Sequence, residues 1–497
     1  MTTLTLADWV QRARQLQIEG RAFINGEYTA AASGETFECL SPVDGRVLGQ
    51  VASCAEADAQ RAVENARQVF DSGVWSRLAP AKRKATMLRF AGLLKEHAEE
   101  LALLETLDMG KPIADSLGID VPGAANALSW SAEAIDKIYD EVAPTPHDQL
   151  GLVTREPVGV VAAIVPWNFP LMMASWKLGP ALATGNSVVL KPSEKSPLTA
   201  IRIAQLAVDA GIPKGVLNVL PGYGHTVGKA LALHMDVDTV VFTGSTKIAK
   251  QLMIYAGESN MKRVWLEAGG KSPNIVFADA PDLAAAAASA ASAIAFNQGE
   301  VCTAGSRLLV ERSIKDTFLP MVVEALKGWK PGNPLDPATT VGALVDTQQM
   351  NTVLSYIEAG HAGGAKLVAG GKRILEESGG TYVEPTIFDG VSNAMKIAQE
   401  EIFGPVLSVL TFDSAEEAIQ IANDTQYGLA AAVWTANISK AHLTAKALRA
   451  GSVWVNQYDG GDMTAPFGGF KQSGNGRDKS LHAFDKYTEL KSTWIKL

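Results

Sequence analysis

The sequence predicts an α/β protein in which largely parallel β-sheets are covered by helices on both faces. Short runs rich in β-branched residues alternate with helical patterns through most of the chain, and these runs are apolar almost throughout. Strands of that kind are buried on both faces, which is typical of parallel sheets. The length of 497 residues is sufficient for two or three domains, each with a substantial core.

The predicted elements follow one another in a regular order. The N-terminal region is richest in helix, with candidates at residues 57–70, 79–97 and 98–107. Strands are then expected at residues 158–165, 187–190, 217–220, 239–243, 274–277, 307–310, 406–412, 431–435 and 452–456. Helices are expected between them, at residues 197–210, 226–234, 246–256, 282–296 and 313–326. The alternating segment 488–497 would be an exposed edge strand if it were unpaired, which suggests a partner subunit.

The composition argues against several classes of protein. Lys and Arg total 44 against 53 Asp and Glu, a net charge of −9, whereas a general nucleic-acid binder would show a basic face. The three cysteines do not form a disulfide framework, and no Cys/His cluster has the spacing of a metal site. Residues 2–20 lack the apolar stretch of an export signal, and segments 158–171 and 283–298 fall short of the roughly 18 strongly apolar residues that cross a bilayer. We therefore expect a soluble, cytoplasmic protein without a membrane partner.

Three predicted strand ends suggest a nucleotide site. The segment from Gly222 to Gly228, which contains Gly224, is one residue longer than the dinucleotide fingerprint and is also compatible with a simple turn. In Thr243-Gly244-Ser245 the glycine allows close backbone approach at a helix N-terminus, although Ser245 is equally compatible with a plain helix cap. A third strand delivers Lys191 to the same edge of the sheet. Ligands of open α/β sheets bind along that edge.

Three further residues suggest covalent chemistry. Cys302 lies in a Gly-punctuated segment between a helix and a strand, and its alternative role is that of a small buried apolar side chain. Glu267 lies between an apolar pair and a Gly-Gly turn, where desolvation would raise its pKa toward that of a general base; it is also compatible with a surface or capping role. Asn168 is held between two prolines and two aromatics, so its amide could donate to an oxyanion or merely satisfy local backbone groups.

Taken together, these segments resemble the aldehyde dehydrogenase superfamily from about residue 23 to the C-terminus. The motifs that carry the likeness, in order, are Pro166-Trp-Asn-Phe-Pro170, Lys191-Pro-Ser-Glu194, Phe242-Thr-Gly-Ser245, Glu267-Ala-Gly-Gly-Lys271, Gln298-Gly-Glu-Val-Cys302, Glu400-Glu-Ile-Phe-Gly-Pro405 and Pro466-Phe-Gly-Gly-Phe470. The resemblance implies a Rossmann-type nucleotide-binding domain, an α/β catalytic domain and a small β oligomerisation element. The implied boundaries are residues 1–137 and 157–268, residues 269–475, and residues 138–156 and 476–497, respectively.

The resemblance also implies the reaction. Cys302 would attack the aldehyde carbon, Asn168 and the Cys302 backbone N–H would stabilise the oxyanion, and hydride transfer to a nicotinamide would leave a thioester that Glu267 hydrolyses through water. The cofactor-binding residues it implies are Val165, Pro166, Trp167, Lys191, Ser193, Glu194, Gly224, Phe242, Gly244, Ser245, Ile248, Gly269, Glu401 and Phe403. Glu194 would repel a 2′-phosphate, so NAD is expected over NADP, although Lys191 leaves NADP possible.

For the aldehyde itself, the resemblance implies a tunnel that suits an extended chain. Its residues would be Asp120, Phe169, Met173, Trp176, Phe296, Val301, Thr303, Asp459 and Phe467. The segment 459–481 is similar to bacterial γ-glutamyl-γ-aminobutyraldehyde and 4-guanidinobutyraldehyde dehydrogenases of polyamine and arginine catabolism. Acidic groups at the entrance would attract a cationic ω-end, although Asp beside Gly is also ordinary turn chemistry.

Several alternatives stay open at this point. A broad-specificity aliphatic aldehyde dehydrogenase lacks the cationic preference, a CoA-acylating enzyme resolves the thioester with a thiol, and a thiol esterase needs only the thiol and the oxyanion site. A non-enzymatic role would leave Cys302 dispensable. We expect a homodimer or homotetramer that acts on a small-molecule aldehyde.

Overall fold

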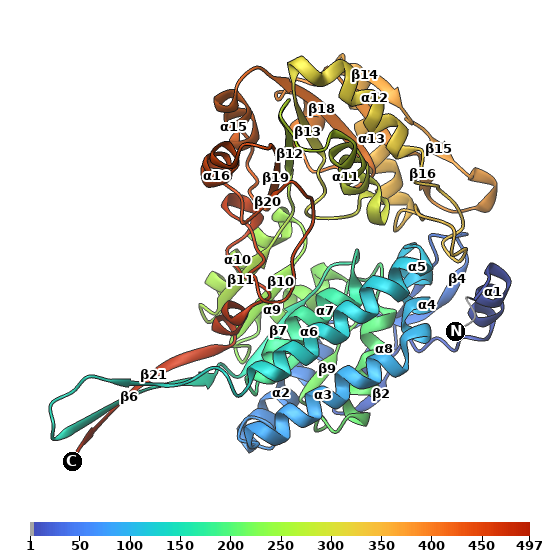
Figure 1. Cartoon of the computed structure of the whole chain (residues 1–497). Helices are drawn as coiled ribbons and strands as arrows, with labels where there is room; N and C mark the ends of the chain where they lie inside the picture. Colours follow the sequence, from blue (N-terminus) through green and yellow to red (C-terminus); the bar gives the residue numbers. More distant parts are fainter. Residues whose placement is uncertain (1–3) are drawn as a thin grey trace.

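Residues 4–497 are described by a computed structural model in which two seven-stranded sheets form the cores of two layers. The N-terminal half builds one layer, the C-terminal half builds the other, and a long ribbon projects from the body (Figure 1). The expected α/β class and its largely parallel sheets are confirmed, and the antiparallel strands at the sheet edges are an addition to the prediction.

The first sheet has the strand order β11-β10-β7-β8-β9-β1-β2. Its parallel strands are β7 (Val160–Ile164), β8 (Ser187–Lys191), β9 (Leu217–Val219), β10 (Thr239–Thr243) and β11 (Arg263–Glu267), and its antiparallel edge is β1 (Ala22–Ile24) and β2 (Glu27–Thr29). The chain runs outward from β7 to β9 and then returns to the other side of β7 as β10. That reversal opens a crevice at the carboxyl ends of β7 and β10, where ligands of open α/β sheets bind.

Helices cover both faces of this sheet because successive strand residues point to opposite sides. In β7, Val161 and Ala163 belong to one buried cluster, and Val160 and Ala162 belong to the other. The helices of this half are α1 (Leu6–Gln15), α2 (Glu56–Ser72), α3 (Pro80–Glu96), α4 (Ala98–Met109), α5 (Ile113–Asp115), α6 (Val121–Ala134), α7 (Pro170–Ala183), α8 (Leu198–Asp209), α9 (Lys229–Leu233) and α10 (Thr246–Glu258), with π-turns at Ser116–Asp120 and Gly224–Gly228.

The second sheet has the order β14-β17-β18-β13-β12-β19-β20 and is parallel except for β14. Its strands are β12 (Pro273–Val276), β13 (Arg307–Glu311), β14 (Lys366–Ala369), β17 (Thr386–Asp389), β18 (Val406–Phe412), β19 (Ala430–Trp434) and β20 (Ser452–Val455). Its helices are α11 (Leu283–Ala295), α12 (Lys315–Leu326), α13 (Thr347–Ala362), α14 (Lys396–Gln399), α15 (Ala415–Asn423) and α16 (Ile438–Ala447).

The projecting ribbon is a three-stranded antiparallel sheet. Its strands are β5 (Glu141–Ala143), β6 (Gln149–Pro157) and β21 (Thr488–Lys496), in the order β21-β6-β5. Short hairpin pairs elsewhere are β3 (Thr36–Leu40) with β4 (Val47–Ala52) and β15 (Arg373–Ile374) with β16 (Tyr382–Val383). The expected edge strand at residues 488–497 therefore pairs within its own chain through β6, and no other strand in the described part of the chain pairs with its second edge. Within residues 4–497, every helix is too short or too polar to cross a lipid bilayer.

Candidate active site

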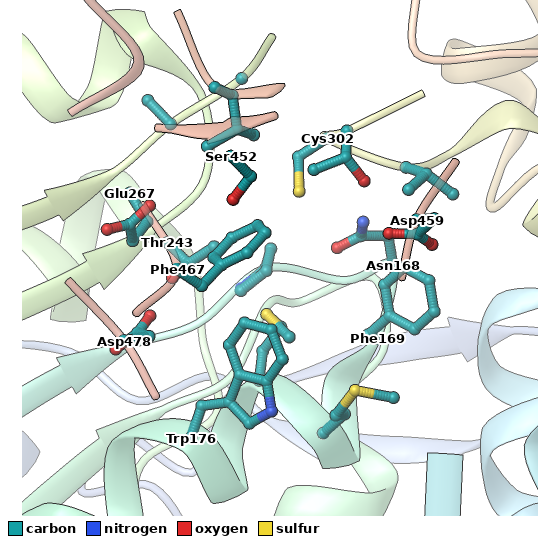
Figure 2. A pocket seen from close by; sticks show the side chains of 18 of the residues that line it. Asn168, Phe169, Trp176, Thr243, Glu267, Cys302, Ser452, Asp459, Phe467 and Asp478 are labelled. Carbon is teal, nitrogen blue, oxygen red and sulfur yellow. The ribbon is translucent and has the colours of Figure 1, made fainter. Parts of the chain in front are cut away.

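A cavity of about 450 Å³ lies between the two sheets. The first sheet contributes Thr243 and Glu267 from the ends of two neighbouring strands, and the second half of the chain contributes Cys302 and Trp454. Figure 2 shows Glu267 and Asn168 on opposite sides of Cys302. The three residues that were singled out as catalytic candidates therefore line one cavity, although they come from segments far apart in the sequence.

Cys302 is presented by a loop whose backbone is held in an unusual conformation. Asn297 and Gln298 adopt φ angles of 46° and 55°, in the left-handed region that most side chains avoid. The loop is fixed by its own amides, because the Gln298 side chain accepts from the Gly342 backbone N–H at 2.9 Å. Gly299 has no room for a side chain, since a Cβ there would overlap the Gly404 backbone. The thiol is thus held in place by a rigid turn.

The environment of Cys302 keeps its sulfur protonated at rest. Burial, together with the nearby carboxylates of Glu401, Asp459 and Glu267, raises the pKa of Cys302 to about 12. Only the thiolate is a strong nucleophile, so the site needs a group that takes the thiol proton when substrate is present.

Asn168 follows β7, and hydrogen bonds fix both its side chain and its main chain. Its Nδ2 donates to the Glu300 carbonyl at 2.8 Å, and the Asn297 amide donates to the Asn168 carbonyl at 3.1 Å. An amide nitrogen carries two N–H groups, so one remains available to a ligand. The buried amide can therefore donate to negative charge that develops on an oxygen near Cys302.

Glu267 ends β11 and is 3% exposed. Within the described chain, neither of its carboxylate oxygens has a hydrogen-bond partner. Burial raises the pKa of Glu267 well above its ordinary value, Asp478 adds to the shift, and Lys177 and Lys486 oppose it. A desolvated carboxyl group of this kind can accept a proton near neutral pH, which is the property of a general base.

The carboxyl edge of the first sheet has the features of a nucleotide site. Lys191 is 3% exposed and forms an ion pair of 3.1 Å with Glu194. Ser245 caps α10, and a Cβ at Gly244 would overlap the Phe242 ring, so the backbone before this helix comes close to the cavity without a side chain. Thr243 Oγ1 is buried and has no hydrogen-bond partner among residues 4–497, so it provides a free polar atom at the same edge.

Glu401 and Gly269 meet at the other side of this crevice. Glu401 accepts a hydrogen bond from the Gly270 N–H at 3.1 Å, and a side chain at Gly269 would overlap the Glu401 carboxylate. Nearby, the Phe403 ring packs edge-on against Trp167 with centroids 5.0 Å apart. These residues, together with the helix N-terminus, fit a dinucleotide that carries ribose hydroxyls and a pyrophosphate.

Comparison with known proteins decides the family. The aldehyde dehydrogenase family matches residues 28–493.

The chain is an aldehyde dehydrogenase family member.

It is 58% identical over 492 residues, and 99% of both chains, to the NADP/NAD-dependent aldehyde dehydrogenase PuuC of Escherichia coli (strain K12). Among solved structures, it is 89% identical, with a TM-score of 0.99 and full coverage of both chains, to P. syringae AldA indole-3-acetaldehyde dehydrogenase, a C302A mutant in complex with NAD⁺ and IAA. It is 64% identical, with a TM-score of 0.98 and coverage of 99% and 100%, to the γ-glutamyl-γ-aminobutyraldehyde dehydrogenase of Burkholderia cenocepacia J2315. The resemblance to the family and the predicted fold are therefore confirmed, and the chain is an oxidoreductase that acts on aldehydes.

The predicted site residues of this aldehyde dehydrogenase fall into two sets. Those that line the cavity are Pro166, Trp167, Asn168, Phe169, Met173, Trp176, Gly244, Ser245, Glu267, Gly269, Phe296, Val301, Cys302, Thr303, Glu401, Phe403, Asp459 and Phe467. Those that lie outside its lining are Asp120, Val165, Lys191, Ser193, Glu194, Gly224, Phe242 and Ile248. Most of the second set follow or end the parallel strands of the first sheet and thus continue the site along its edge; Gly224 and Ile248 are exposed there.

Asp120 is a correction. It was expected at the tunnel entrance, but its side chain is fully buried and bonds to the Lys111 ammonium at 2.6 Å. The same ammonium contacts Glu105 at 3.2 Å and lies 3.9 Å from the centre of the Phe169 ring. The prediction was wrong because Lys111, nine residues earlier, neutralises Asp120, and its neighbour Ile119 lines the cavity instead.

Two charged features of this aldehyde dehydrogenase were not anticipated. Asp478 is buried between Lys177 and Lys486 and forms ion pairs with both. The next residue, Lys479, lines the cavity beside Trp176 and Phe467. The only sequence signal was weak: the pair Asp478-Lys479 follows a glycine-rich segment. Nothing in that pattern indicated which of the two side chains would line the cavity.

Proposed function

We propose that this enzyme oxidises an aldehyde to a carboxylic acid with NAD⁺ or NADP⁺, through a thioester on Cys302. The observation that carries the proposal is the placement of the Cys302 thiol, the Asn168 amide and the unpartnered Glu267 carboxylate around one cavity. Within residues 4–497, no group of three or more metal-binding side chains is arranged to hold a metal ion.

The first step forms a bond between Cys302 Sγ and the aldehyde carbon. The thiol proton passes to a base, for which Glu267 is the available carboxylate, and the electron pair of the carbonyl moves onto oxygen. The Asn168 N–H and the Cys302 backbone N–H then donate to that oxygen. One oriented donor of this kind typically accounts for about 10²–10³ in rate, because it stabilises charge that develops only during the reaction.

A bound nicotinamide supplies the hydride acceptor. Loss of hydride from the tetrahedral carbon leaves a thioester on Cys302. Glu267 releases the thiol proton to solvent and then takes a proton from water as the water oxygen attacks the acyl carbon. The C–S bond breaks, the acid leaves, and the Cys302 thiolate recovers a proton. Covalent capture thus divides the oxidation into two easier steps.

The residues around Lys191 support a preference for NAD⁺. Glu194 keeps its carboxylate about a third exposed and is held by Lys191 at the sheet edge, where it is positioned to accept from ribose hydroxyls. A carboxylate there would repel a 2′-phosphate, whereas the Lys191 ammonium partly offsets the repulsion, so NADP⁺ remains a usable second cofactor.

For the aldehyde, we propose an extended chain with a nitrogen-bearing polar end, of the ω-amino, ω-guanidino or γ-glutamylamino butyraldehyde type. Support comes from the Burkholderia relative and from Asp459 at the cavity lining, since Asp120 no longer contributes. Indole-3-acetaldehyde is a second candidate, because the P. syringae relative is named for it and aromatic side chains line the cavity, among them Phe169, Trp176, Phe296 and Phe467.

A substrate panel tests both proposals. NADH or NADPH formation is measured with ω-amino, ω-guanidino, γ-glutamylated, indolyl and plain aliphatic aldehydes, and acid release is measured without CoA. Acid release that requires CoA would favour an acylating enzyme, and release of product without either cofactor would favour a thiol esterase. A uniform rate across the panel would favour a broad-specificity aliphatic enzyme.

We also propose that residues 1–137 and 157–268 form the nucleotide-binding domain, residues 269–475 the catalytic domain, and residues 138–156 with 476–497 the oligomerisation element of a homodimer or homotetramer in the cytoplasm. The open edge of β21 supports the last assignment. Leu490 and Trp494 there are 62% and 63% exposed, and large apolar side chains on an open strand are typical of an interface.

A further inference from the structure

Lys479 brings a positive charge to the substrate end of the cavity. Its ammonium lies 4.5 Å from the centre of the Trp176 ring and 5.5 Å from that of Phe467. These two rings pack edge to face at 5.3 Å, and Figure 2 shows them together below Cys302. A cation over aromatic faces is attracted to them, so this position is favourable for the lysine itself.

The backbone fixes this placement. Lys479 and Ser480 adopt φ angles of 56° and 51°, a conformation that costs free energy in residues other than glycine. Just before them, Asp478 is anchored by its buried ion pairs, and its backbone N–H and carbonyl both bond to Phe467 at 2.7 Å. The anchored Asp478 therefore fixes the backbone next to Lys479, and the Lys479 side chain lines the cavity.

The Lys479 ammonium remains free to bind a ligand. Within residues 4–497 it has no hydrogen-bond acceptor, and no carboxylate lies within 4.0 Å of it. Its pKa is lowered by burial, while Asp459, Asp478 and Asp462 act in the opposite direction. Asp459 and Asp462 line the same cavity and their charges act on Lys479, so the cavity offers one cation and two carboxylates to a bound substrate.

We propose that Lys479 is a specificity-determining residue that binds a carboxylate at the far end of the substrate, and that with Asp459 it selects aldehydes ending in an α-amino acid group over those ending in a free amine or guanidinium. A substrate with only a cationic end would be repelled by Lys479, because the Lys479 ammonium already occupies the favourable position over the Trp176 and Phe467 rings. A zwitterionic end places its carboxylate on Lys479 and its ammonium on Asp459, so both charges are compensated. This inference rests on the proposed aldehyde oxidation and narrows its substrate class.

The test compares three aldehydes whose far ends differ in charge: γ-glutamyl-γ-aminobutyraldehyde has a zwitterionic end, 4-guanidinobutyraldehyde has a cationic end, and hexanal is neutral. Lys479→Met keeps most of the side-chain stem, and Lys479→Arg keeps the charge. Lys366→Met, at the exposed first residue of β14, serves as the matched control. We expect Lys479→Met to lower kcat/KM for the glutamylated aldehyde by about tenfold or more, mainly through KM, because a charge-assisted contact is lost. The guanidino substrate should gain or stay constant, hexanal should change less than about twofold, and Lys479→Arg should restore most of the loss.

An equal loss for all three aldehydes, or no loss for the glutamylated one, would overturn the proposal. A variant-free measurement covers the case in which Lys479→Met does not fold. N⁵-propylglutamine, the γ-propylamide of glutamate, keeps the α-amino acid end but has no aldehyde. It should inhibit the unmodified enzyme at least about tenfold better than its α-methyl ester, and equal inhibition would exclude a carboxylate contact. Failure of the unmodified enzyme to oxidise hexanal or any other aldehyde would instead contradict the proposed function, so the two failures are distinct.

Discussion

The side-chain amide of Asn168 donates to the main-chain carbonyl of Glu300 at 2.8 Å, two residues before Cys302. This bond ties the end of β7 in the first sheet directly to the loop that presents the nucleophile. The oxyanion donor and the thiol therefore hold their relative position through one short contact rather than through the packing of two separate layers.

Replacement of Asn168 tests that contact. Asn168→Ala removes the donor, so we expect kcat to fall by about 10²–10³ with a smaller effect on KM. Asn168→Asp keeps the shape but places a negative charge where the oxyanion forms, and its loss should be at least as large. Steady-state kinetics with hexanal measure both; a change confined to KM would show that Asn168 acts only in substrate binding.

Replacement of Cys302 tests the covalent step. Cys302→Ala should reduce NADH formation by more than about 10³-fold, because no other group supplies the nucleophile. Mass spectrometry of the unmodified enzyme, quenched during turnover, should show an acyl adduct on the peptide that carries Cys302. The buried thiols Cys39 and Cys54 provide internal controls, and an adduct on either would reassign the nucleophile.

Replacement of Glu267 tests its role as a proton acceptor in both halves of the reaction. Since burial raises the pKa of Glu267, its proton-accepting carboxylate form accumulates as pH increases, and the hydrolysis rate should rise with pH through that pKa. Glu267→Gln should abolish this rise and leave a thioester that hydrolyses slowly. Because Glu267 also accepts the thiol proton, a rapid-quench experiment should show a slowed first turnover of at most one NADH per site, followed by slow steady turnover. Steady turnover with an unchanged pH profile would argue against the role of Glu267.

The buried cluster of Glu105, Lys111 and Asp120 has a predictable effect on stability. Lys111→Met leaves two uncompensated carboxyl groups in the interior, which typically costs about 3–5 kcal/mol and should lower the thermal midpoint by several degrees. Adding Glu105→Gln and Asp120→Asn should recover much of that loss. Calorimetry of the single and triple variants, with Lys366→Met as the surface control, decides whether charge compensation is the cause.

The projecting ribbon has its own test. Trp494→Ser combined with Leu490→Ser removes the large exposed apolar groups of β21, so sedimentation should show a smaller assembly than that of the unmodified enzyme. Val142→Ser, on β5 at the opposite edge of the ribbon, serves as a comparison. An unchanged sedimentation coefficient in the double variant would place the interface elsewhere.

Periodicity predicted most of the parallel strands, because their apolar runs are dictated by burial on both faces, but it missed β11, which ends at Glu267, and β17. It did not predict α7, which begins at Pro170 directly after the Asn168 motif, since an apolar run broken by prolines gives no clear helical signal. The identities of Cys302, Glu267 and Asn168 were accessible from their motifs. The pairing of Asp120 with Lys111 and the inward orientation of Lys479 were not, because they depend on tertiary contacts and on positive φ angles that composition does not specify.

The cavity is shared between two sheets, with Glu267 ending a strand of one and Cys302 on a loop that leads into the other. A chain in which only one layer has formed contains a thiol without its base, or a base without its thiol. Recovery of dehydrogenase turnover after denaturation would thus report the simultaneous completion of both halves, whereas spectroscopic recovery of helix content would respond to either one alone.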